Sequence, residues 1–480
     1  MADKKAFYLT TTLPYVNADP HIGFALEIVQ ADVQARYRAL MGDEVFFNTG
    51  TDEHGIKIYR KALEEGKNPQ AYVDEYAAKF RGLKEKLDLY PDIHFIRTTD
   101  AKHKAAAQEF WLRCLKSGDI YKKNYQIRYC VGCELEKTSS DLVDGKCPLH
   151  PNLEIELIDE ENYFFKFSNY AQKLLALYTE RPDFVIPDFR FNEIKKFIEE
   201  GLEDFSISRL KAKMPWGVAV PNDEAHVMYV WFDALVDYVS TIDWPQDEKS
   251  FKKWWVDTGG VVQFAGKDQI RQQAAMWQAM LMSAGLPPSK QIVIHGFINV
   301  GGHKMSKSLG NVINPYDLVE EYGTDAVRYY LARHISPFED SDFTLEKFKE
   351  AYNANLANGL GNLVARVMQL AQTHLTQHAK LEGVTYEQEF KDFLEKFELN
   401  KAMDYVWARI GALDEKITAT APFKLVKTDP EAGKKLIEEM VIELAAIDLM
   451  LEPILPATSR KIIEAIVANK KPENLFARKD

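Results

Sequence analysis

Cysteine is scarce in this sequence: four occur among 480 residues, so a scaffold held together by disulfide bonds is excluded. Long apolar runs are also missing, since no stretch approaches the roughly 18 consecutive apolar residues of a transmembrane helix. The first residues, Met1–Lys5, lead directly into a strand-like run and lack the apolar segment of a signal peptide. We therefore expect a cytoplasmic protein with no membrane partner.

An excess of basic residues is absent as well. The formal net charge is −12, and domains that bind nucleic acids are usually basic. Any contact with RNA would need a local positive surface on an acidic body, and its binding would be sensitive to salt. The length and the hydrophobic content of 46% allow two to four globular domains, each with its own core.

One basic loop stands out against this background. The stretch Lys304-Met305-Ser306-Lys307-Ser308 lies between glycines and follows an apolar run at 291–298. A strand that ends in such a loop places two ammonium groups at its carboxyl end, where open α/β sheets bind their ligands. Lysines three residues apart can both reach a polyphosphate chain. The alternative is a solvated basic loop on the surface.

Three further strands are predicted to end in polar residues. Residues 6–13 favour a buried parallel strand, after which Asp19 is predicted to cap a helix that reaches to about residue 38. One interpretation is that His21 and the backbone N–H groups in the first turn of this helix bind a phosphate group. The alternative is that the histidine merely caps a turn. The strand at 44–48 leads to Asp52, which either pairs with a ligand ammonium or caps a helix. The strand at 261–265 leads to Asp268, which can accept from ribose hydroxyls.

The strongest local signal is a cysteine and histidine pattern. Cys130-x2-Cys133-x13-Cys147-x2-His150 has the spacing of two knuckles that hold one structural zinc ion in a tetrahedral site. Four protein ligands leave no position for a catalytic water, so the metal would fold the segment. The alternative is a set of buried unpaired thiols, which is also the expectation for Cys114.

Two other stretches leave alternatives open. The aromatic run at 229–238 indicates either ordinary core packing or a pocket for a thioether side chain, because sulfur packs well against aromatic edges. From Leu345 onward the apolar periodicity predicts a helical bundle. On its first long helix, Asn362 and Arg366 lie on one surface. This surface either binds exposed RNA bases or is an ordinary solvated face.

Taken together, these motifs resemble class I aminoacyl-tRNA synthetases. The stretches at 14–24, 51–55, 204–209, 229–234 and 304–308 are similar to the methionyl branch, and the resemblance runs from about Lys5 to Phe476. Three residues depart from the family pattern. Phe24 and Gln273 stand where the family usually has histidines, and Phe423 stands where it has a tryptophan.

The resemblance implies a set of roles. The implied catalytic residues are His21, Asp52, Arg209, Lys304 and Lys307. The implied ATP-binding residues are Asn17, His21, Gly23, Phe24, Gly266, Asp268, Ile298, Lys304 and Lys307. Methionine would be bound by Leu13, Tyr15, Asp52, Trp231, Ala234, Tyr238, Ile270 and Gln273. The anticodon would be bound by Asn362, Arg366 and Phe423.

The expected fold is a doubly wound, Rossmann-like parallel sheet with a zinc-knuckle insertion, followed by an all-α bundle. The predicted parts are 1–117 and 226–310 (catalytic domain), 118–225 (insertion), 311–350 (connector) and 351–480 (bundle). The resemblance implies ligation of methionine to its tRNA, with ATP and Mg²⁺, by a monomer that carries one structural Zn²⁺.

Three other functions remain as alternatives. A leucyl or valyl enzyme would need a longer insertion for its editing domain, and a small-molecule nucleotidyltransferase would not need the bundle. A non-catalytic, zinc-containing tRNA-binding paralogue stays open because of Phe24, Gln273 and Phe423.

Overall fold

The computed structural model describes residues 4–133, 135–137, 141–305, 310–377 and 379–479. The chain divides into two compact units, each built from separate stretches of sequence. The first unit comprises residues up to 20, 41–82 and 91–294, and the second comprises 21–40, 83–90 and the residues from 295 onward. The finer division into five parts stays a prediction.

The first unit is organised around a six-stranded sheet with the order β3-β2-β1-β12-β13-β7. Its strands are β1 (Ala6–Thr10), β2 (Glu44–Thr51), β3 (His94–Arg97), β7 (Val185–Ile186), β12 (Val262–Gly266) and β13 (Gln291–His295). β1 pairs in parallel with both β2 and β12, and the outer pairs β2–β3 and β13–β7 are parallel as well. The strands that follow β1 are therefore added to the sheet on both sides of it, which is the doubly wound order. The predicted fold class is confirmed.

Helices and an aromatic core complete this unit. The helices are α2 (Ile56–Glu64), α3 (Pro69–Arg81), α5 (Ala101–Lys116), α6 (Ala171–Glu180), α7 (Asp188–Glu199), α8 (Val230–Ala234), α9 (Asp237–Ser240), α10 (Glu248–Phe251) and α11 (Trp277–Ser283). Three fully buried tryptophans, Trp111, Trp255 and Trp277, belong to one core with Phe110, whose ring stacks on that of Trp277 at 5.4 Å. Cys114 is buried in the same core, as expected.

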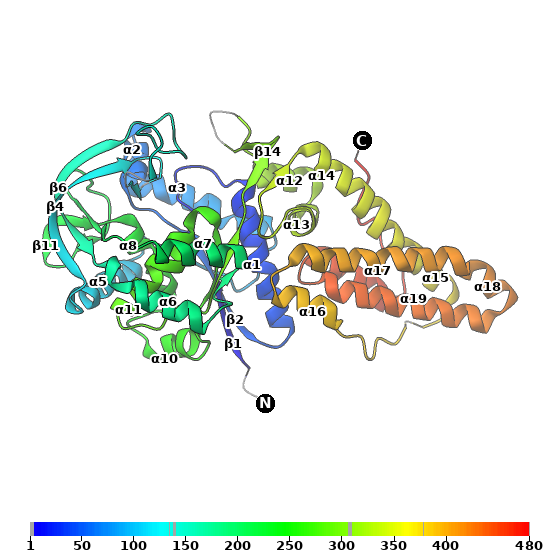
Figure 1. Cartoon of the computed structure of the whole chain (residues 1–480). Helices are drawn as coiled ribbons and strands as arrows, with labels where there is room; N and C mark the ends of the chain where they lie inside the picture. The colour runs from blue at the N-terminus through cyan, green and yellow to red at the C-terminus, as the bar shows by residue number, and fades with distance from the viewer. Residues whose placement is uncertain (1–3, 134, 138–140, 306–309, 378, 480) are drawn as a thin grey trace. The chain divides into compact units, whose positions relative to one another are not determined.

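The predicted insertion carries two antiparallel sheets. One has the order β5-β4-β6-β8 and is built from β4 (Ile120–Cys130), β5 (Leu135–Glu136), β6 (Glu156–Phe165) and β8 (Phe205–Ser206). The long strands β4 and β6 run side by side in Figure 1 and pair along their whole length. The other has the order β10-β11-β9, from β9 (Ser208–Leu210), β10 (Ala219–Val220) and β11 (Asp223–Met228). Because β4 ends at Cys130, the first knuckle begins where the long hairpin turns.

The second unit begins with α1 (Ile22–Leu40) and packs it against C-terminal segments. A three-stranded sheet has the order β15-β14-β16, from β14 (Ile298–Val300), β15 (His303–Lys304) and β16 (Ser341–Phe343). The fully buried Arg328 of α13 (Thr324–Arg333) binds Asp32 of α1 at 2.7 Å and donates to the carbonyl oxygens of Leu87 and Ile454. Breaking such a buried pair by removing one partner costs about 3–5 kcal/mol, so this contact fixes α1 within the unit.

From α14 (Leu345–Ala351) onward the described chain is helical, as predicted. The other helices of the unit are α4 (Leu83–Lys86), α12 (Pro315–Tyr322), α15 (Asn362–His374), α16 (Gln388–Glu395), α17 (Leu399–Thr420), α18 (Pro422–Thr428), α19 (Pro430–Leu451) and α20 (Pro456–Val467). Figure 1 shows α17 and α19 lying side by side. The buried stripe of α15, Leu363, Val364, Val367, Met368 and Ala371, is the one that the apolar periodicity predicted.

Two local predictions are wrong. Asp19 does not cap α1: its carboxylate pairs with Lys79 at 2.8 Å, and the His21 carbonyl oxygen accepts from the backbone N–H groups of Phe24 and Ala25 instead. The sequence of the connector also favours a strand directly after the lysine loop, and this prediction is wrong, because the described residues 310–314 lead straight into α12. Among the residues that the structure describes, no helix is long and apolar enough to cross a membrane.

Candidate functional site

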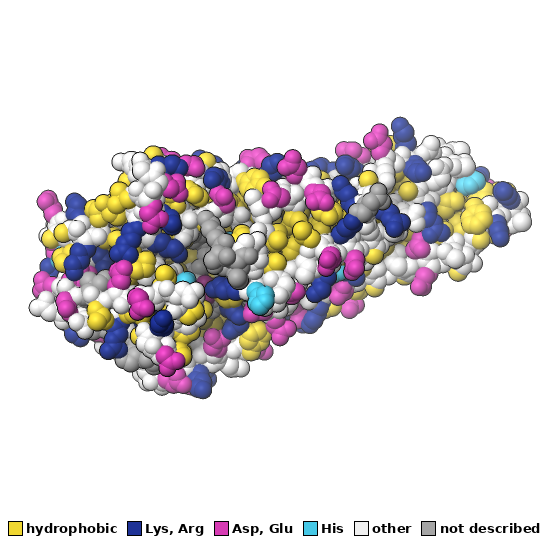
Figure 2. Space-filling view, turned by 90° about the horizontal axis from the view of Figure 1, so that it is seen from above, with side chains coloured by type: hydrophobic (Ala, Val, Ile, Leu, Met, Phe, Trp, Pro, Cys, Tyr) yellow, Lys and Arg dark blue, Asp and Glu magenta, His cyan; other side chains and the backbone are white. Residues whose placement is uncertain are grey.

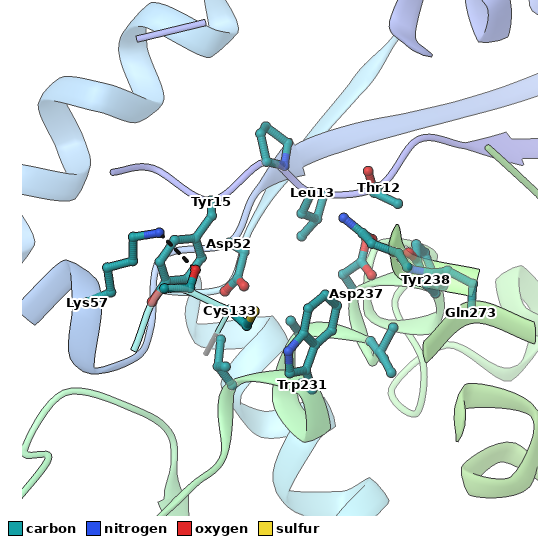
Figure 3. Close-up of a pocket in the computed structure, with 16 residues that line it drawn as sticks. Thr12, Leu13, Tyr15, Asp52, Lys57, Cys133, Trp231, Asp237, Tyr238 and Gln273 are labelled. Carbon is teal, nitrogen blue, oxygen red and sulfur yellow. Dashed lines mark hydrogen bonds between the residues drawn. The ribbon is translucent and has the colours of Figure 1, made fainter. Parts of the chain in front are cut away.

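A cavity of about 180 Å³ lies in the first unit where β1 and β2 end (Figure 3). Its walls come from the segment after β1, the segment after β2, helices α8 and α9, and the first cysteine knuckle. The residues that line it are Thr12, Leu13, Pro14, Tyr15, Asp52, Lys57, Gly132, Cys133, Val230, Trp231, Ala234, Leu235, Asp237, Tyr238, Gln269 and Gln273. Seven of the eight predicted methionine-binding residues are among them. Ile270 is the exception; it belongs to the buried core of the unit.

Backbone pairing places Asp52 beside Tyr15. The N–H of Val16 donates to the carbonyl oxygen of Asp52 at 3.2 Å, and the N–H of Asp52 donates to that of Pro14 at 3.0 Å. These bonds continue the parallel pairing of β1 and β2 beyond the sheet, with Tyr15 and Asp52 opposite each other. The Asp52 carboxylate is nearly buried and points into the cavity in Figure 3. Of the two earlier alternatives, this position favours a contact with a ligand, since α2 begins four residues further on with Gly55 as its cap.

The two residues after Asp52 hold it in place. Glu53 is fully buried and accepts from Arg97 at 2.6 and 2.9 Å in a bidentate ion pair. His54 lies against Asp233 of α8, with its Nδ1 atom 3.4 Å from a carboxylate oxygen. The segment is therefore tied both to the end of β3 and to the helix that carries Trp231.

Asp233 lies at the centre of a buried charge cluster. His103 of α5 approaches the same carboxylate at 3.7 Å and contacts the Ser240 hydroxyl at 3.0 Å. Burial opposes the ionisation of Asp233, but the two histidines hold the pKa of its carboxyl below the ordinary value. A carboxyl group that is held by one histidine of α5 and one of the segment after β2 fixes the position of α8.

A second buried carboxyl, Asp237, belongs to the cavity wall itself. Burial raises the pKa of this carboxyl well above its ordinary value, and the Asn48 amide donates to it at 3.4 Å. Beside it, the side-chain oxygen of Gln273 accepts from Gln263 at 2.8 Å, and the Gln273 amide donates to Gln269 at 3.4 Å. This end of the cavity thus combines a buried carboxyl group, whose ionisation is disfavoured, with an oriented amide.

The cysteine knuckle forms the opposite wall. Gly132 and Cys133 line the cavity, and Lys57 donates to the Gly132 carbonyl oxygen at 3.3 Å, as the dashed line in Figure 3 shows. The neighbouring Val131 packs with Tyr15 and Trp231 in a small apolar cluster. The folding of the knuckle and the shape of the cavity are therefore physically linked.

The predicted metal ligands do converge. One ligand atom from each of Cys130, Cys133, Cys147 and His150 lies within 4.8 Å of the others. The Cys133 Sγ atom is 3.4 Å from Cys147 Sγ and 3.2 Å from His150 Nδ1, and Cys130 Sγ is 3.8 Å from the same nitrogen. Zinc bound about 2.3 Å from each sulfur in a tetrahedron requires sulfur separations of about 3.8 Å. The donor set and its spacing fit a closed, four-ligand metal centre.

The second unit brings the two remaining signature stretches together. A Cβ atom added at Gly23 would lie 2.9 Å from His21 Cε1 and 3.5 Å from Met305 Cε, so the His21 ring and the Met305 side chain both lie close to this glycine. The Gly23 N–H donates to His21 Nδ1 at 3.1 Å. Lys304 lies on β15 with its Nζ atom 5.1 Å from the centroid of the Phe297 ring. Lys307 lies outside the described residues.

The other predicted ATP-binding residues divide between the units. In the first unit, Asn17 donates through its N–H to the Tyr15 carbonyl oxygen at 2.8 Å, Gly266 ends β12, and Asp268 follows in an exposed turn. In the second unit, Ile298 begins β14 and is buried. Phe24 lies on the first turn of α1.

The predicted anticodon residues lie on α15 and α18. Asn362 is exposed at the start of α15, and Arg366 follows one turn later and pairs with Asp414 of α17. Phe423 is 48% exposed at the start of α18, with the Lys424 ammonium 5.9 Å from its ring centroid, so an aromatic side chain and a cation are both offered at this surface.

Arg209 is not among the residues that line the cavity. Its guanidinium lies 4.4 Å from the Tyr229 ring centroid and donates to the Ser206 hydroxyl at 2.8 Å. It borders a separate cavity of the first unit, of about 410 Å³, together with Tyr129 and Glu160. The residues that the sequence analysis missed are Thr12, Lys57, Asp237 and Gln269, together with the supporting Glu53. Asp237 carried a signal, since a carboxylate inside an aromatic run is unusual; Thr12, Lys57 and Gln269 carried none.

Comparison with known proteins places this architecture in a class. The family model described as "tRNA synthetases class I (M)" matches residues 7–154 and 136–368, which is more than half of the chain. The chain therefore has the fold of a class I tRNA synthetase.

The relatives narrow the class to one branch. The methionine–tRNA ligase of a Nostoc species is 40% identical over 96% of this chain and 90% of its own length, and that of Thermosynechococcus vestitus is 42% identical over 95% and 89%. The solved structure of Mycobacterium tuberculosis methionyl-tRNA synthetase in complex with methionyl-adenylate has a TM-score of 0.89 at 33% identity and covers 99% of both chains. The chain belongs to the methionyl-tRNA synthetase family.

Proposed function

We propose that this protein joins methionine to its tRNA in two steps, with ATP as the activating substrate. The observation that carries the proposal is the cavity of the first unit, in which a nearly buried carboxylate, Asp52, faces apolar and aromatic walls. The relatives named above carry this activity in their names, and one solved relative holds methionyl-adenylate.

The cavity offers groups that match both the α-ammonium group and the side chain of methionine. Asp52 is placed to accept from the α-ammonium group, and a charge-assisted hydrogen bond of this kind is strong away from bulk water. Leu13, Tyr15, Trp231 and Ala234 supply aliphatic and aromatic surface for the thioether. One methylene is worth only about 1–3 kcal/mol of discrimination, so homocysteine is the expected competitor.

The first step needs no general base, because the methionine carboxylate is already ionised. Its oxygen attacks the α-phosphorus of ATP, a new O–P bond forms, the bond to the bridging oxygen breaks, and pyrophosphate leaves with that electron pair. Catalysis then consists of positioning and of stabilising the charge that develops on the phosphates.

We assign that stabilisation to residues of the two signature stretches. His21 and Lys304 lie in the two stretches that meet at Gly23, and both offer donors to a triphosphate; Lys307 is assigned the same role from the sequence. Gly266 and Asp268 are assigned to the adenosine, with Asp268 accepting from the ribose hydroxyls. Phe24 cannot donate to phosphate, so its contribution is an apolar wall.

In the second step a hydroxyl of the terminal ribose of tRNA attacks the carbonyl carbon of the adenylate. A new ester bond forms, the mixed anhydride breaks, and AMP leaves with the electron pair. The helical bundle holds the anticodon end, where Asn362 and Arg366 offer hydrogen bonds and Phe423 offers a stacking surface. On the face in Figure 2 basic and acidic side chains are interspersed, which suits local contacts with RNA better than a broad electrostatic one.

Two metals belong to the proposal. Cys130, Cys133, Cys147 and His150 would hold one Zn²⁺, which supplies folding energy to the knuckle and leaves no open position for chemistry. Mg²⁺ would enter with ATP and neutralise phosphate charge. The monomeric state stays a prediction that sedimentation velocity can test.

ATP–pyrophosphate exchange across a panel of amino acids tests the function. Exchange that depends on methionine supports the proposal. Exchange that depends on another amino acid overturns the assigned substrate, and a folded protein without exchange supports the non-catalytic tRNA-binding alternative.

A further inference from the structure

Lys57 is the only cation among the described residues that line the methionine cavity, the cavity in which Asp52 lies. It is the second residue of α2, and the first turn of this helix contains no acidic side chain. A cation at this end of a helix meets the positive end of the helix dipole, so a lysine here does not stabilise α2. The contacts of its ammonium group explain its position better than the helix does.

The Lys57 ammonium group joins three separate segments of the first unit. It donates to the Gly132 carbonyl oxygen of the knuckle at 3.3 Å and lies 5.9 Å from the centroid of the Tyr15 ring (Figure 3). It also donates at 3.0 Å to the side-chain oxygen of Asn17, in the amide orientation that gives both ends of this group a partner. Helix α2, the knuckle and the segment after β1 therefore meet at one positive charge.

The contact with Lys57 decides which end of the Asn17 amide faces a ligand. While the amide oxygen accepts from Lys57, the amide nitrogen donates to the Tyr15 carbonyl oxygen at 3.1 Å. An amide nitrogen carries two hydrogens, so one N–H remains for a bound molecule. The reversed amide would place its nitrogen against the ammonium group, where two donors would face each other without an acceptor. The lysine therefore presents Asn17 to a ligand as a hydrogen-bond donor.

A phosphate group is the ligand that such a donor suits, because ionised phosphate oxygens only accept hydrogen bonds and gain most from donors that are oriented beforehand. The sequence resemblance assigns Asn17 to ATP. We propose that Lys57 is a positioning residue for ATP: it fixes the Asn17 amide so that the second N–H of this amide donates to an oxygen of the triphosphate. This inference rests on the proposed function, from which it takes ATP as the ligand.

A double-mutant cycle on nucleotide binding tests the proposal. The probe is adenosine 5′-(α,β-methylene)triphosphate with Mg²⁺, which cannot release pyrophosphate, and its dissociation constant is measured by calorimetric titration. Asn17→Ala should bind it at least about tenfold more weakly than the wild type, because a hydrogen bond to a charged acceptor is lost, and Lys57→Met at least about fivefold more weakly. The double variant should stay within about twofold of Asn17→Ala, because Lys57 acts through Asn17.

Two further variants separate positioning from general damage. Asn17→Asp keeps an acceptor for Lys57 but has no N–H to donate, so it should bind the probe no better than Asn17→Ala does. This variant retains the lysine, so its result does not depend on how Lys57→Met folds. Lys67→Met removes an exposed lysine that pairs with Glu65 and Glu75 just beyond the same helix, and it should bind like the wild type.

A full second loss of affinity in the double variant would show that Lys57 acts through its own charge, and it would overturn the proposal. Undiminished binding to Lys57→Met or Asn17→Asp, or no binding of the probe to the wild type, would overturn it as well. Pyrophosphate exchange by the wild type distinguishes this failure from that of the proposed function. Methionine-dependent exchange with additive losses overturns the positioning role alone, whereas a non-additive cycle in a protein without exchange overturns the proposed function alone.

Discussion

Adding one methyl group at Gly132 should perturb the metal knuckle and the amino-acid cavity together. A Cβ atom at this position would lie 2.5 Å from two ring carbons of His150 and 2.8 Å from its Nδ1 atom. Ordinary van der Waals contact begins at 3.4 Å, so the imidazole in Gly132→Ala has to retreat from 2.5 Å by about 0.9 Å. Metal–ligand distances tolerate only about 0.2 Å, and the variant should therefore lose His150 as a ligand.

The expected loss of metal affinity follows from the contribution of His150 as a direct ligand. Changes to outer-shell partners of metal ligands already weaken metal binding by about 10–100-fold, so loss of a direct ligand should weaken it by at least about 100-fold. Because Gly132 and Cys133 also line the methionine cavity, the KM for methionine in pyrophosphate exchange should rise in parallel. Metal content after dialysis against a chelator, followed by exchange kinetics, measures both effects.

The matched control is Gly145→Ala in the same loop region. Gly145 has a φ of +75° but no atom within 4 Å of an added Cβ, so the change strains the backbone by about 1–2 kcal/mol and leaves His150 untouched. This variant should melt earlier and keep its metal. A Gly132→Ala protein that retains one tightly held metal ion with an unchanged KM would refute the reasoning about both the knuckle and its link to the cavity.

Other predictions concern single side chains. Asp52→Asn should raise the KM for methionine at least about tenfold, since a charged hydrogen bond becomes a neutral one; an unchanged KM would place the ammonium elsewhere. Lys307→Ala should lower exchange by orders of magnitude without changing the melting temperature, and unchanged exchange would remove this lysine from the mechanism. Arg366→Ala should slow tRNA charging and leave exchange intact; equal loss of both would argue against an anticodon role. Burial raises the pKa of Asp448 to about 8, so the folded chain binds this proton more tightly than the unfolded chain does. Stability should fall by up to about 1.4 kcal/mol per unit as pH rises from about 4 to about 8, and Asp448→Asn should flatten that slope in urea melts at each pH; parallel slopes would refute it.

The fold was predictable because its strongest signals are local and repeat along the chain. Apolar strands alternate with helices, and the stripe of α15 from Leu363 to Ala371 follows from helical periodicity alone. The prediction for Asp19 failed for a physical reason. An aspartate before a proline satisfies the local rule for a helix cap, but Lys79 competes for the same carboxylate from 60 residues away. Sequence spacing does not reveal that competitor.

The cavity was predictable to the extent that its residues belong to motifs. Asp52 and Trp231 come from contiguous stretches whose chemistry is apparent without a structure. Asp237 lines the same cavity, but its raised pKa depends on burial that arises only when the unit has folded. The opposite wall depends on Gly132, whose role in the cavity exists only after the hairpin of β4 and β6 has folded.

The consequence of each departure from the family pattern depends on the contacts that the residue at that position makes. Gln273 replaces an imidazole, yet it is held by Gln263 at 2.8 Å and by Gln269 at 3.4 Å, so its amide is as firmly oriented as a hydrogen-bonded ring would be. Phe423 keeps an exposed aromatic ring but has no N–H to donate, so stacking is the contribution left to it. An oriented amide beside the buried carboxyl group of Asp237 can still donate to a thioether. This end of the cavity therefore retains hydrogen-bonding capacity, and retained chemistry of this kind favours an active ligase over a paralogue that only binds tRNA.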